Sequence, residues 1–401
     1  MKNLILKILI LVLSLSLMAF AVGCDETVED NGQTTGNYKY KVETRTVYDE
    51  EKEENVEHKY YVITGYEVSS EDALKMADGD YSTVTAFREI EIPKTGKDIS
   101  KDLNDYPVEE IEAGAFSNQV ILTSVKVGSN ILKIGEGAFA GCTNLKSLTL
   151  PFVGESVDAV NSKRLFGYIF GASATGEGNV QVTTKNHERK DDSGESILNE
   201  SEVTFYVPSS LTTIDLSSST ITSISECAFY GVTTIKNITI PETVVDIESH
   251  AFFGCTALAS FDMKNVKNVY EYAFSGCTSL LTVDFKNVEV LQKAVFENCS
   301  KLGAKKLANS DDEELLTIKL PASVKELGKK AFSGCSSIVY FNLKGTAVTT
   351  IENSAFANMV ALKKITINDN SVIKTGAFTG CALLKKNVEG TYTQEVKAFD
   401  D

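Results

Sequence analysis

The chain has 401 residues and a formal net charge of -16 at pH 7, with 43% hydrophobic and 23% charged residues. This balance excludes wholesale disorder, and at this length the chain holds either several globular cores or one elongated array. The acidic charge, with no stripe of Lys and Arg, excludes nucleic acid as a partner, because a phosphate backbone attracts cations.

Residues 1–23 predict an export leader. Lys2 and Lys7 form a basic start, and the apolar stretch from Ile8 to Met18 is too short to span a bilayer comfortably. Without these 23 residues, which include two Lys and no acidic residue, the net charge becomes -18. We therefore expect an exported protein.

A lipidation signal follows the apolar stretch. Residues 21–24, AVGC, resemble a bacterial lipobox, in which the cysteine receives a diacylglycerol thioether and becomes the new N-terminus. We expect Cys24 to hold the chain at a membrane through this lipid alone. Lipoboxes most often have Leu in place of Ala21, and ordinary signal cleavage near Ala21 or Gly23 is the alternative. Residues 24–37 are polar without apolar periodicity, which predicts a flexible tether.

Residues 38–86 predict an N-terminal β cap. Tyr38–Tyr48 and Lys59–Tyr66 are rich in Tyr, Val and Thr, and a charged bridge separates them, which is typical of a β-hairpin. The first unit of a repeat array exposes apolar groups and unpaired strand edges. We expect the hairpin to cover them.

A repeat with steps of mostly 22 to 24 residues occupies residues 87–384. Each unit has a buried aromatic position, usually preceded by Ala, with an apolar residue five positions earlier. The predicted core phenylalanines are Phe116, Phe139, Phe229, Phe252, Phe274, Phe296, Phe332, Phe356 and Phe378. A G-C-[TS] segment usually follows, and then an L-x-x-I-x-[IL] segment that often ends in Pro.

The I-x-I alternation predicts a short strand with one buried face in each unit. Leu148, Leu150 and Pro151 are a clear case. Proline cannot continue a hydrogen-bonded ladder, so it ends the strand and turns the chain. Stacked units place these strands side by side as a parallel sheet, and each unit depends on its neighbours for burial.

The unit V-x-x-I-x-x-x-A-F-x-G-C-[ST]-x-L-x-x-[IV]-x-[IL]-P resembles the BspA-type leucine-rich repeat, which is found on many bacterial surface proteins. The resemblance implies a β-rich solenoid of leucine-rich repeats of about 22–24 residues with short parallel strands. For function it implies adhesion or partner binding, since such a family is defined by its repeat.

Two insertions interrupt the predicted array, near residues 172–202 and 303–314. Both are polar, and we interpret them as loops that tolerate changes in length, with recognition as the alternative. Phe166 lies in the long interval between Phe139 and Phe229 and is a candidate for a degenerate core position. The pattern is lost in the C-terminal tail, residues 385–401, where fraying is expected.

Six cysteines lie three residues after a repeat phenylalanine: Cys142, Cys255, Cys277, Cys299, Cys335 and Cys381. Val232 and Met359 occupy the same position, which a packing role permits and an obligatory bridge forbids. We expect a ladder of buried free thiols; a disulfide between neighbours is the alternative if they approach closely enough. Cys227 is out of register with this ladder, so the sequence leaves open whether its side chain is exposed.

The sequence offers no starting point for catalysis. It contains no C-x-x-C, G-x-S-x-G, H-E-x-x-H or P-loop pattern, and its three histidines, at positions 58, 187 and 250, are scattered. His250 is expected at the surface. We predict no catalytic residue, no metal and no cofactor, and hence no enzyme.

The outward residues of the predicted strands form the candidate binding face. These are Thr149, Thr239, Asp262, Asp284, Lys319, Asn342 and Thr366, with Tyr340 in the adjacent column. A mixed polar stripe suits a protein partner on a host, bacterial or matrix surface, although an ordinary solvated sheet has the same appearance. The alternative is a glycan-capture or nutrient-capture lipoprotein. The shortage of aromatic side chains on these columns, where Tyr340 alone qualifies, speaks against it.

Overall fold

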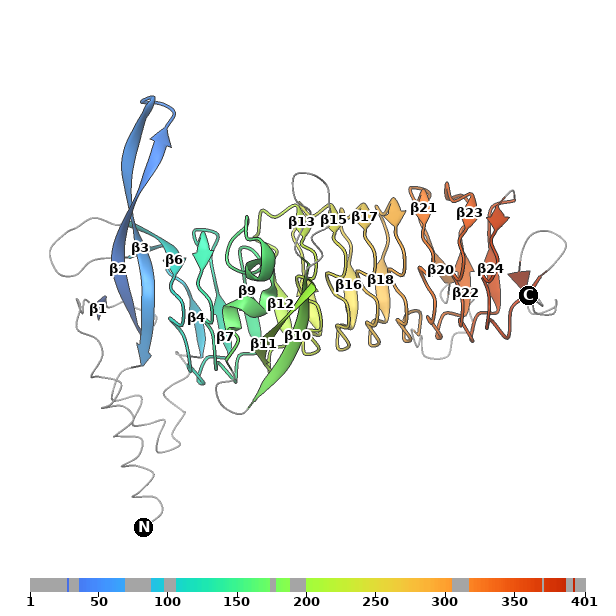
Figure 1. Cartoon of the computed structure of the whole chain (residues 1–401), viewed down its shortest axis with the longest axis horizontal. Coiled ribbons are helices and arrows are strands. Elements are labelled where there is room, and N and C mark those ends of the chain that lie inside the picture. Colours follow the sequence, from blue (N-terminus) through green and yellow to red (C-terminus); the bar gives the residue numbers. More distant parts are fainter. Residues whose placement is uncertain are drawn as a thin grey trace, which may run out of the picture.

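The computed structural model describes residues 27–28, 36–68, 88–96, 106–173, 178–187, 200–304, 317–369, 371–386 and 392–393. Figure 1 shows an elongated stack of coils with a β-hairpin projecting at its N-terminal end. The predicted leader, Cys24 and most of the insertion at 303–314 lie outside these residues. Within them, no helix has the length and apolar character needed to cross a bilayer.

One side of every coil is a three-residue strand, and we call this row of strands the strand face. The middle residue of each strand points inward and its two neighbours point outward, as the alternation predicts. Parallel hydrogen bonding joins the strands in three runs, β4 to β14, β16 to β18 and β20 to β24. The members are β4 (Glu89–Glu91), β7 (Ser124–Lys126), β9 (Ser147–Thr149), β12 (Thr213–Asp215), β14 (Asn237–Thr239), β16 (Ser260–Asp262), β18 (Thr282–Asp284), β20 (Thr317–Lys319), β22 (Tyr340–Asn342) and β24 (Lys364–Thr366).

A second row of parallel strands lies at the apolar residue five positions before each repeat phenylalanine. The sequence did not predict strands there. That residue, such as Ile247 or Leu291, is buried and ends a two-residue strand. The row comprises β6 (Tyr106–Ile111), β8 (Lys133–Ile134), β13 (Ser223–Ile224), β15 (Asp246–Ile247), β17 (Asn268–Val269), β19 (Val290–Leu291), β21 (Glu326–Leu327), β23 (Thr350–Ile351) and β25 (Val372–Ile373). The solenoid is therefore β-rich with short parallel strands, as predicted.

The repeat phenylalanines form a stack along the inside of the solenoid. Neighbouring rings in the regular coils lie 5.1 to 6.0 Å apart, and Phe274 is fully buried. From Phe116 to Phe356, each such residue donates its backbone N–H to a carbonyl oxygen of the next coil, as Phe274 does to Val295 at 2.9 Å. The residues two before and two after the phenylalanine have positive φ, for example Tyr272 at 57° and Gly276 at 77°. The consensus glycine of G-C-[TS] therefore occupies a left-handed position that disfavours other residues.

The interval between Phe139 and Phe229 contains two strands of the strand face, β9 and β12, and the chain between them forms an expanded coil. The 3-10 helix η3 (Phe166–Phe170) lies in its interior, with Phe166 and Phe170 both fully buried, and η2 (Asn161–Arg164) precedes it with only Arg164 buried. Phe170 lies 6.5 Å from Phe139, and Phe166 lies 5.0 Å from Phe229. Two rings thus carry the stack across this coil.

The insertion at 172–202 is not simply an irregular loop. Strands β10 (Asn179–His187) and β11 (Glu200–Pro208) pair antiparallel over nine positions. Phe205 and Val207 of β11 are buried in the solenoid core. The hairpin is therefore built on the core, although its polar sequence gave little sign of strands.

The predicted N-terminal hairpin is present as β2 (Gly36–Asp49) and β3 (Glu54–Val68), which pair antiparallel. β3 continues the second row by pairing parallel with β6 through Tyr61, Val62 and Ile63. The ring of Phe116 in the first coil lies 6.3 Å from Tyr38 and 5.5 Å from Tyr66. These contacts cover the first aromatic position of the array.

Short strands complete both ends of the molecule. β1 (Thr27–Val28) pairs with β2, and β5 (Thr95–Gly96) pairs antiparallel with β6. In the tail, where fraying was expected, β27 (Tyr392–Thr393) pairs antiparallel with both β24 and β26 (Lys385–Lys386). The last strand of the strand face therefore has an antiparallel neighbour.

Candidate binding surfaces

The structure brings the eight predicted binding residues onto one face. The third residues of neighbouring strands lie directly beside one another: Thr149 beside Asp215, Asp215 beside Thr239, Asp262 beside Asp284, Lys319 beside Asn342, and Asn342 beside Thr366. Tyr340 lies in the adjacent column, between Thr317 and Lys364. The same columns include Glu91, Lys126 and Asp215, which sequence reasoning missed although EIEI, SVKV and TIDL carry the same alternation.

Several acidic and amide side chains of this column have a structural role. The carboxylate of Asp262 accepts the backbone N–H of Lys264 at 2.9 Å, and Asp284 accepts that of Lys286 at 3.1 Å. Asn342 accepts the N–H of Lys344 in the same way, at 2.8 Å. Such Asx turns reverse the chain at the strand end. Coils that end their strand with proline instead have Thr149, Thr239 or Lys319 at this position, and these residues are the better candidates for contacts with a partner.

The predicted cysteine ladder contains six hydrogen-bonded thiols. Each Sγ donates to the carbonyl oxygen of the repeat phenylalanine in the preceding coil, as Cys142 does to Phe116 at 3.1 Å and Cys381 to Phe356 at 2.9 Å. Burial raises the pKa of Cys142 to about 12 and that of Cys381 to about 11. These two thiols are therefore protonated at neutral pH and are poor nucleophiles and metal ligands.

Cys227 is buried, so the exposed position that the sequence left open for it is wrong. Its side chain has no solvent exposure, and its φ is 57°. The residue lies at the left-handed position two before Phe229, and its N–H donates to Ser249 of the next coil at 3.1 Å. The seven described cysteines are all free and buried.

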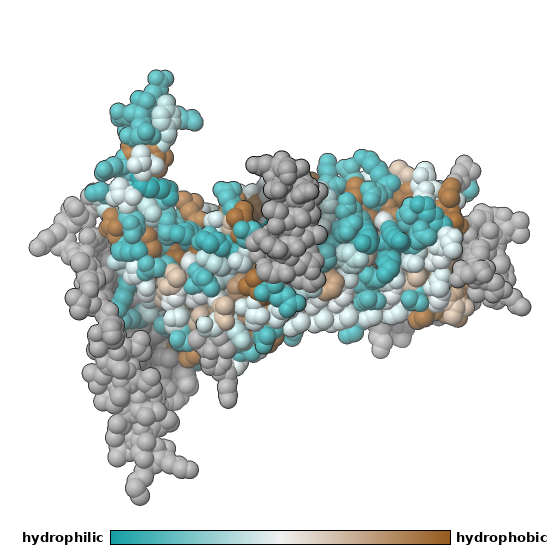
Figure 2. All heavy atoms as spheres, viewed as in Figure 1, coloured by the Kyte–Doolittle hydropathy of each residue, from teal (hydrophilic) through white to brown (hydrophobic). Residues whose placement is uncertain are grey.

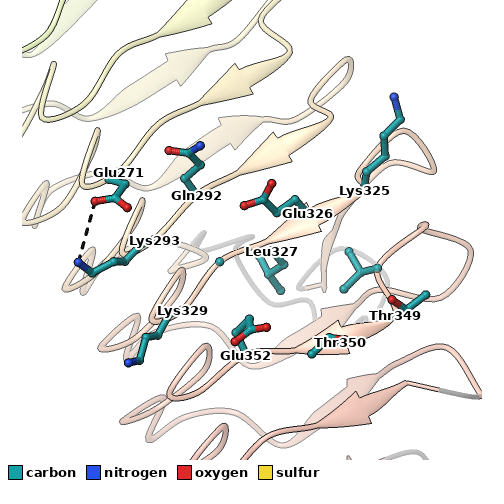
Figure 3. Close-up of a pocket in the computed structure, with 12 residues that line it drawn as sticks. Glu271, Gln292, Lys293, Lys325, Glu326, Leu327, Lys329, Thr349, Thr350 and Glu352 are labelled. Atoms are coloured by element: carbon teal, nitrogen blue, oxygen red, sulfur yellow. Dashed lines mark ion pairs between the residues drawn. The ribbon is translucent and has the colours of Figure 1, made fainter. Parts of the chain in front are cut away.

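A shallow polar groove lies on the outer side of the second row, around β21 (Figure 3). Its volume is about 450 Å³. Gly328 lines it, and the equivalent positions of the neighbouring coils are Gln292 and Glu352, which also line it. Among the described residues, no ladder hydrogen bonds join β21 to β23. Both signs of charge line the groove, including the Lys293 and Glu271 pair at 3.9 Å. The groove can donate and accept hydrogen bonds but has no charge preference.

A second cavity, of about 290 Å³, is acidic and lies closer to the N-terminal end of the same row. Glu226, Asp246, Glu248 and Tyr270 line it. Burial, Asp246 and Glu248 together raise the pKa of Tyr270. Across the described residues, no three His, Cys, Asp or Glu side chains are grouped so that they could hold a metal ion.

Four partly exposed rings cluster on the phenylalanine side of three successive coils. Tyr230 stacks on Phe253 with centroids 4.7 Å apart, and His250 stacks on Tyr272 at 5.0 Å. The Nζ atom of Lys293 lies 5.1 Å from the Tyr272 centroid. Sequence reasoning missed this cluster because it searched the strand columns for aromatic residues. His250 is half-buried within it.

The sequence was also compared with known proteins. Residues 109–163, 201–314 and 309–398, together more than half of the chain, match the BspA type leucine rich repeat region in six copies. None of the curated proteins compared with the chain matches it.

Solved structures show similar repeat proteins at low sequence identity. A leucine-rich repeat protein from Bacteroides ovatus is 16% identical with a TM-score of 0.36, covering 85% of this chain and 79% of its own. A leucine rich cell surface protein from Faecalibacterium prausnitzii is 18% identical with a TM-score of 0.31, covering 90% and 94%. A leucine-rich repeat protein from Eubacterium ventriosum is 18% identical with a TM-score of 0.36, covering 87% of this chain and 97% of its own.

Proposed function

The chain belongs to the BspA-type leucine-rich repeat family, and from this premise we propose that it is a lipid-anchored cell-surface module that binds a protein partner through the strand face. The partner lies on a host, bacterial or matrix surface. Binding rather than catalysis fits a family whose shared feature is its repeat.

The observation that carries this proposal is the register of the strand face. Ten strands present two outward residues each, and parallel pairing keeps those residues in columns along the solenoid. The core does not require their side chains, because burial is supplied by the inward residue between them. A broad face that mixes hydroxyl, amide and both charges suits the polar surface of a folded protein, where many small contacts add up.

Matched substitutions test the face. Thr239→Arg places a long cation in the middle of the strand face, whereas Thr256→Arg makes the same change at an exposed turn elsewhere in the coil. We expect Thr239→Arg to weaken binding to a cell or matrix surface at least tenfold, while Thr256→Arg binds like the unchanged chain. Equal effects of the two substitutions would contradict the proposal.

The lipid anchor has its own test. Cys24→Ala removes the acceptor of the thioether, so we expect the protein to leave the membrane fraction and appear in the medium. The control is Cys381→Ala, which removes a buried thiol near the C-terminal end of the solenoid. A Cys24→Ala protein that remains with the membrane would show that the lipid is not what holds the chain there.

Glycan capture is the second candidate function, and the aromatic cluster favours it. Sugar rings pack on aromatic side chains, and the cluster supplies four rings with the Lys293 ammonium over one of them. A glycan array read with the unchanged chain and with Tyr272→Ala separates the two functions. Saturable sugar binding that Tyr272→Ala abolishes would favour glycan capture over the strand-face proposal.

A further inference from the structure

The groove around β21 opens where the hydrogen bonding of the second row is interrupted. Across the intact junction between β23 and β25, the N–H of Lys374 donates to the carbonyl oxygen of Ile351 at 2.9 Å. The equivalent bond across the groove, from Glu352 to Leu327, is missing among the described residues. An N–H group of one coil and a carbonyl oxygen of the preceding coil are therefore left without their usual partners at the groove.

A longer turn accounts for this interruption. Leu343 and Ile351, which point inward at the two ends of the turn, are eight positions apart, whereas the equivalent residues Phe285 and Leu291 are six positions apart. The phenylalanine rings on either side of the junction lie 6.0 Å apart, compared with 5.4 Å at each of the two preceding junctions. The extra chain length thus separates two coils that are otherwise stacked in the regular way.

The gap is too narrow for an additional strand. Backbone hydrogen bonds close it at both ends, from Ala347 to Val324 at 2.9 Å and from Lys330 to Asn353 at 3.2 Å. An inserted strand would need its two neighbours about 9–10 Å apart, which is twice the spacing of strands in a sheet. The unpaired backbone groups can therefore be reached by small polar groups such as hydroxyls, but not by a whole peptide backbone.

The side chains around the gap carry no net charge. The groove is lined by three lysines and three glutamates, which are Lys293, Lys325, Lys329, Glu271, Glu326 and Glu352. Four of the six have ion-pair partners, and the two that have none in the described part of the chain, Glu326 and Lys329, are of opposite sign. Figure 2 shows mainly hydrophilic residues over β17 to β21, along the upper part of the solenoid. These surroundings suit a polar ligand without charge.

We propose that this groove binds a neutral carbohydrate. A sugar hydroxyl has one donor and two acceptor lone pairs, so it can donate to the carbonyl oxygen of Leu327 and accept from the N–H of Glu352. Thr349 and Thr350 add hydroxyl groups and Gln292 adds an amide to the same groove (Figure 3). Its volume of about 450 Å³ is within the range of small-ligand sites.

The aromatic cluster lies at one end of this groove. Lys293 lines the groove and holds its ammonium 5.1 Å from the ring centroid of Tyr272, and Glu271 lines the groove as well. A sugar chain can pack on the Tyr272 ring and continue into the groove. The inference rests on glycan capture, the second candidate function, and gives it a polar subsite. It does not depend on the strand face.

Matched substitutions test the groove. Thr350→Arg fills it with a long side chain, whereas Thr256→Arg makes the same change at an exposed turn outside the groove. The probes are neutral oligosaccharides of glucose, galactose, mannose and N-acetylglucosamine on an array, followed by calorimetry with the tightest binder. We expect Thr350→Arg to weaken binding about tenfold or more, while Thr256→Arg binds like the unchanged chain. Circular dichroism checks that both variants are folded.

The outcomes separate the groove from glycan capture as a whole. Sugar binding that Tyr272→Ala abolishes and Thr350→Arg leaves unchanged would overturn the groove and keep the aromatic cluster as the sugar site. Binding confined to sialylated or sulfated glycans would overturn the preference for a neutral ligand. If the unchanged chain binds no glycan on the array, both the groove and glycan capture fail, and the strand-face proposal is unaffected.

Hydrogen exchange of single amides tests the contact without any substitution. The N–H groups of Thr350 and Glu352 have no acceptor in the described residues, whereas those of Val372 and Lys374 donate to the coil before them. In the full chain saturated with the tightest-binding oligosaccharide, exchange should slow about tenfold at Thr350 and Glu352 and stay unchanged at the other two amides. Nuclear magnetic resonance follows each amide. No slowing at Thr350 and Glu352, or equal slowing at all four, would overturn the proposal.

Discussion

The regular coils from Phe252 to Phe332 and the expanded coil between Phe139 and Phe229 build the same stack from different lengths of chain. Steps of 22 residues separate Phe252, Phe274 and Phe296, with one ring in each coil. The interval from Phe139 to Phe229 spans 90 residues and includes the expanded coil, which continues the stack with Phe166 and Phe170 together. The comparison indicates that the solenoid needs an unbroken column of rings and a ladder of backbone hydrogen bonds, rather than a fixed spacing in sequence.

The largest expected effect tests the column of rings in both regions. Phe274→Ala should lower the free energy of unfolding by about 3–5 kcal/mol, as aromatic truncations in cores do, because both neighbouring rings lose contacts. Phe166→Ala should have a comparable effect, since it contacts Phe229 at 5.0 Å. Urea unfolding followed by circular dichroism measures both. A near-neutral Phe166→Ala would show that the expanded coil is held by something other than its rings.

The second-largest expected effect is a loss of stability from substitution at a left-handed position of a regular coil. Gly276→Ala adds a Cβ at a φ of 77° and should cost about 1–2 kcal/mol. Ala294→Gly relieves the same kind of conformation, at a φ of 54°, and should change stability by less than about 1 kcal/mol in either direction. Thermal unfolding of both variants compares them. Similar destabilisation by the two substitutions would argue against backbone strain as the cause.

The thiol ladder gives a pH dependence. The folded pKa of Cys142, about 12, is raised above the ordinary thiol value of 9.0, so between these two pH values the folded state holds a proton that the unfolded state has lost. Stability from this group is fully present below pH 9 and declines as the pH rises towards 12, by about 1.4 kcal/mol at pH 10. Cys142→Ala should flatten this decline in a comparison of urea unfolding at pH 8 and pH 10. An unchanged slope would show that other groups, such as the buried tyrosines, control alkaline stability.

The smallest expected effect is in the β10–β11 hairpin beside the expanded coil. His187 pairs with Glu200, so residues 188–199 can be replaced by a two-residue Asn-Gly turn without altering the ladder. Loop-closure entropy changes slowly with length, so stability should shift by less than about 1 kcal/mol. Thermal unfolding measures the shift. A loss of several kcal/mol would show that the hairpin end contributes to the fold.

The sequence predicted the parts of the fold that repeat. Phe, Cys and Pro share one register, and the I-x-I alternation identified the strand face, because identical surroundings in each coil select the same residue types. The second row escaped detection because all its strands except β6 have only two residues, too few to show an alternation. Strands β10 and β11 escaped because their pairing joins polar segments on either side of a charged stretch.

The candidate surfaces were predicted less completely than the fold. The columns of the strand face followed from the alternation, but the Asx turns of Asp262 and Asp284 did not, because a D-x-K sequence alone does not reveal which N–H the carboxylate accepts. The aromatic cluster depends on turn positions in different coils, as with Tyr230 and Phe253, which are far apart in sequence. The burial of Cys227 could not be predicted from the sequence, because the residue occupies a left-handed backbone position that the sequence does not reveal.

The antiparallel strands at the two ends of the solenoid have a consequence for assembly. Parallel coils could in principle extend from one molecule into the next, head to tail, and such contacts produce fibres because they never close. Here β2 runs against β3 at the N-terminal end of the second row, and β27 runs against β24 at the C-terminal end of the strand face, so neither of these two ladder ends offers the parallel strand that an incoming coil would continue. These two ladder ends are thereby protected from head-to-tail extension.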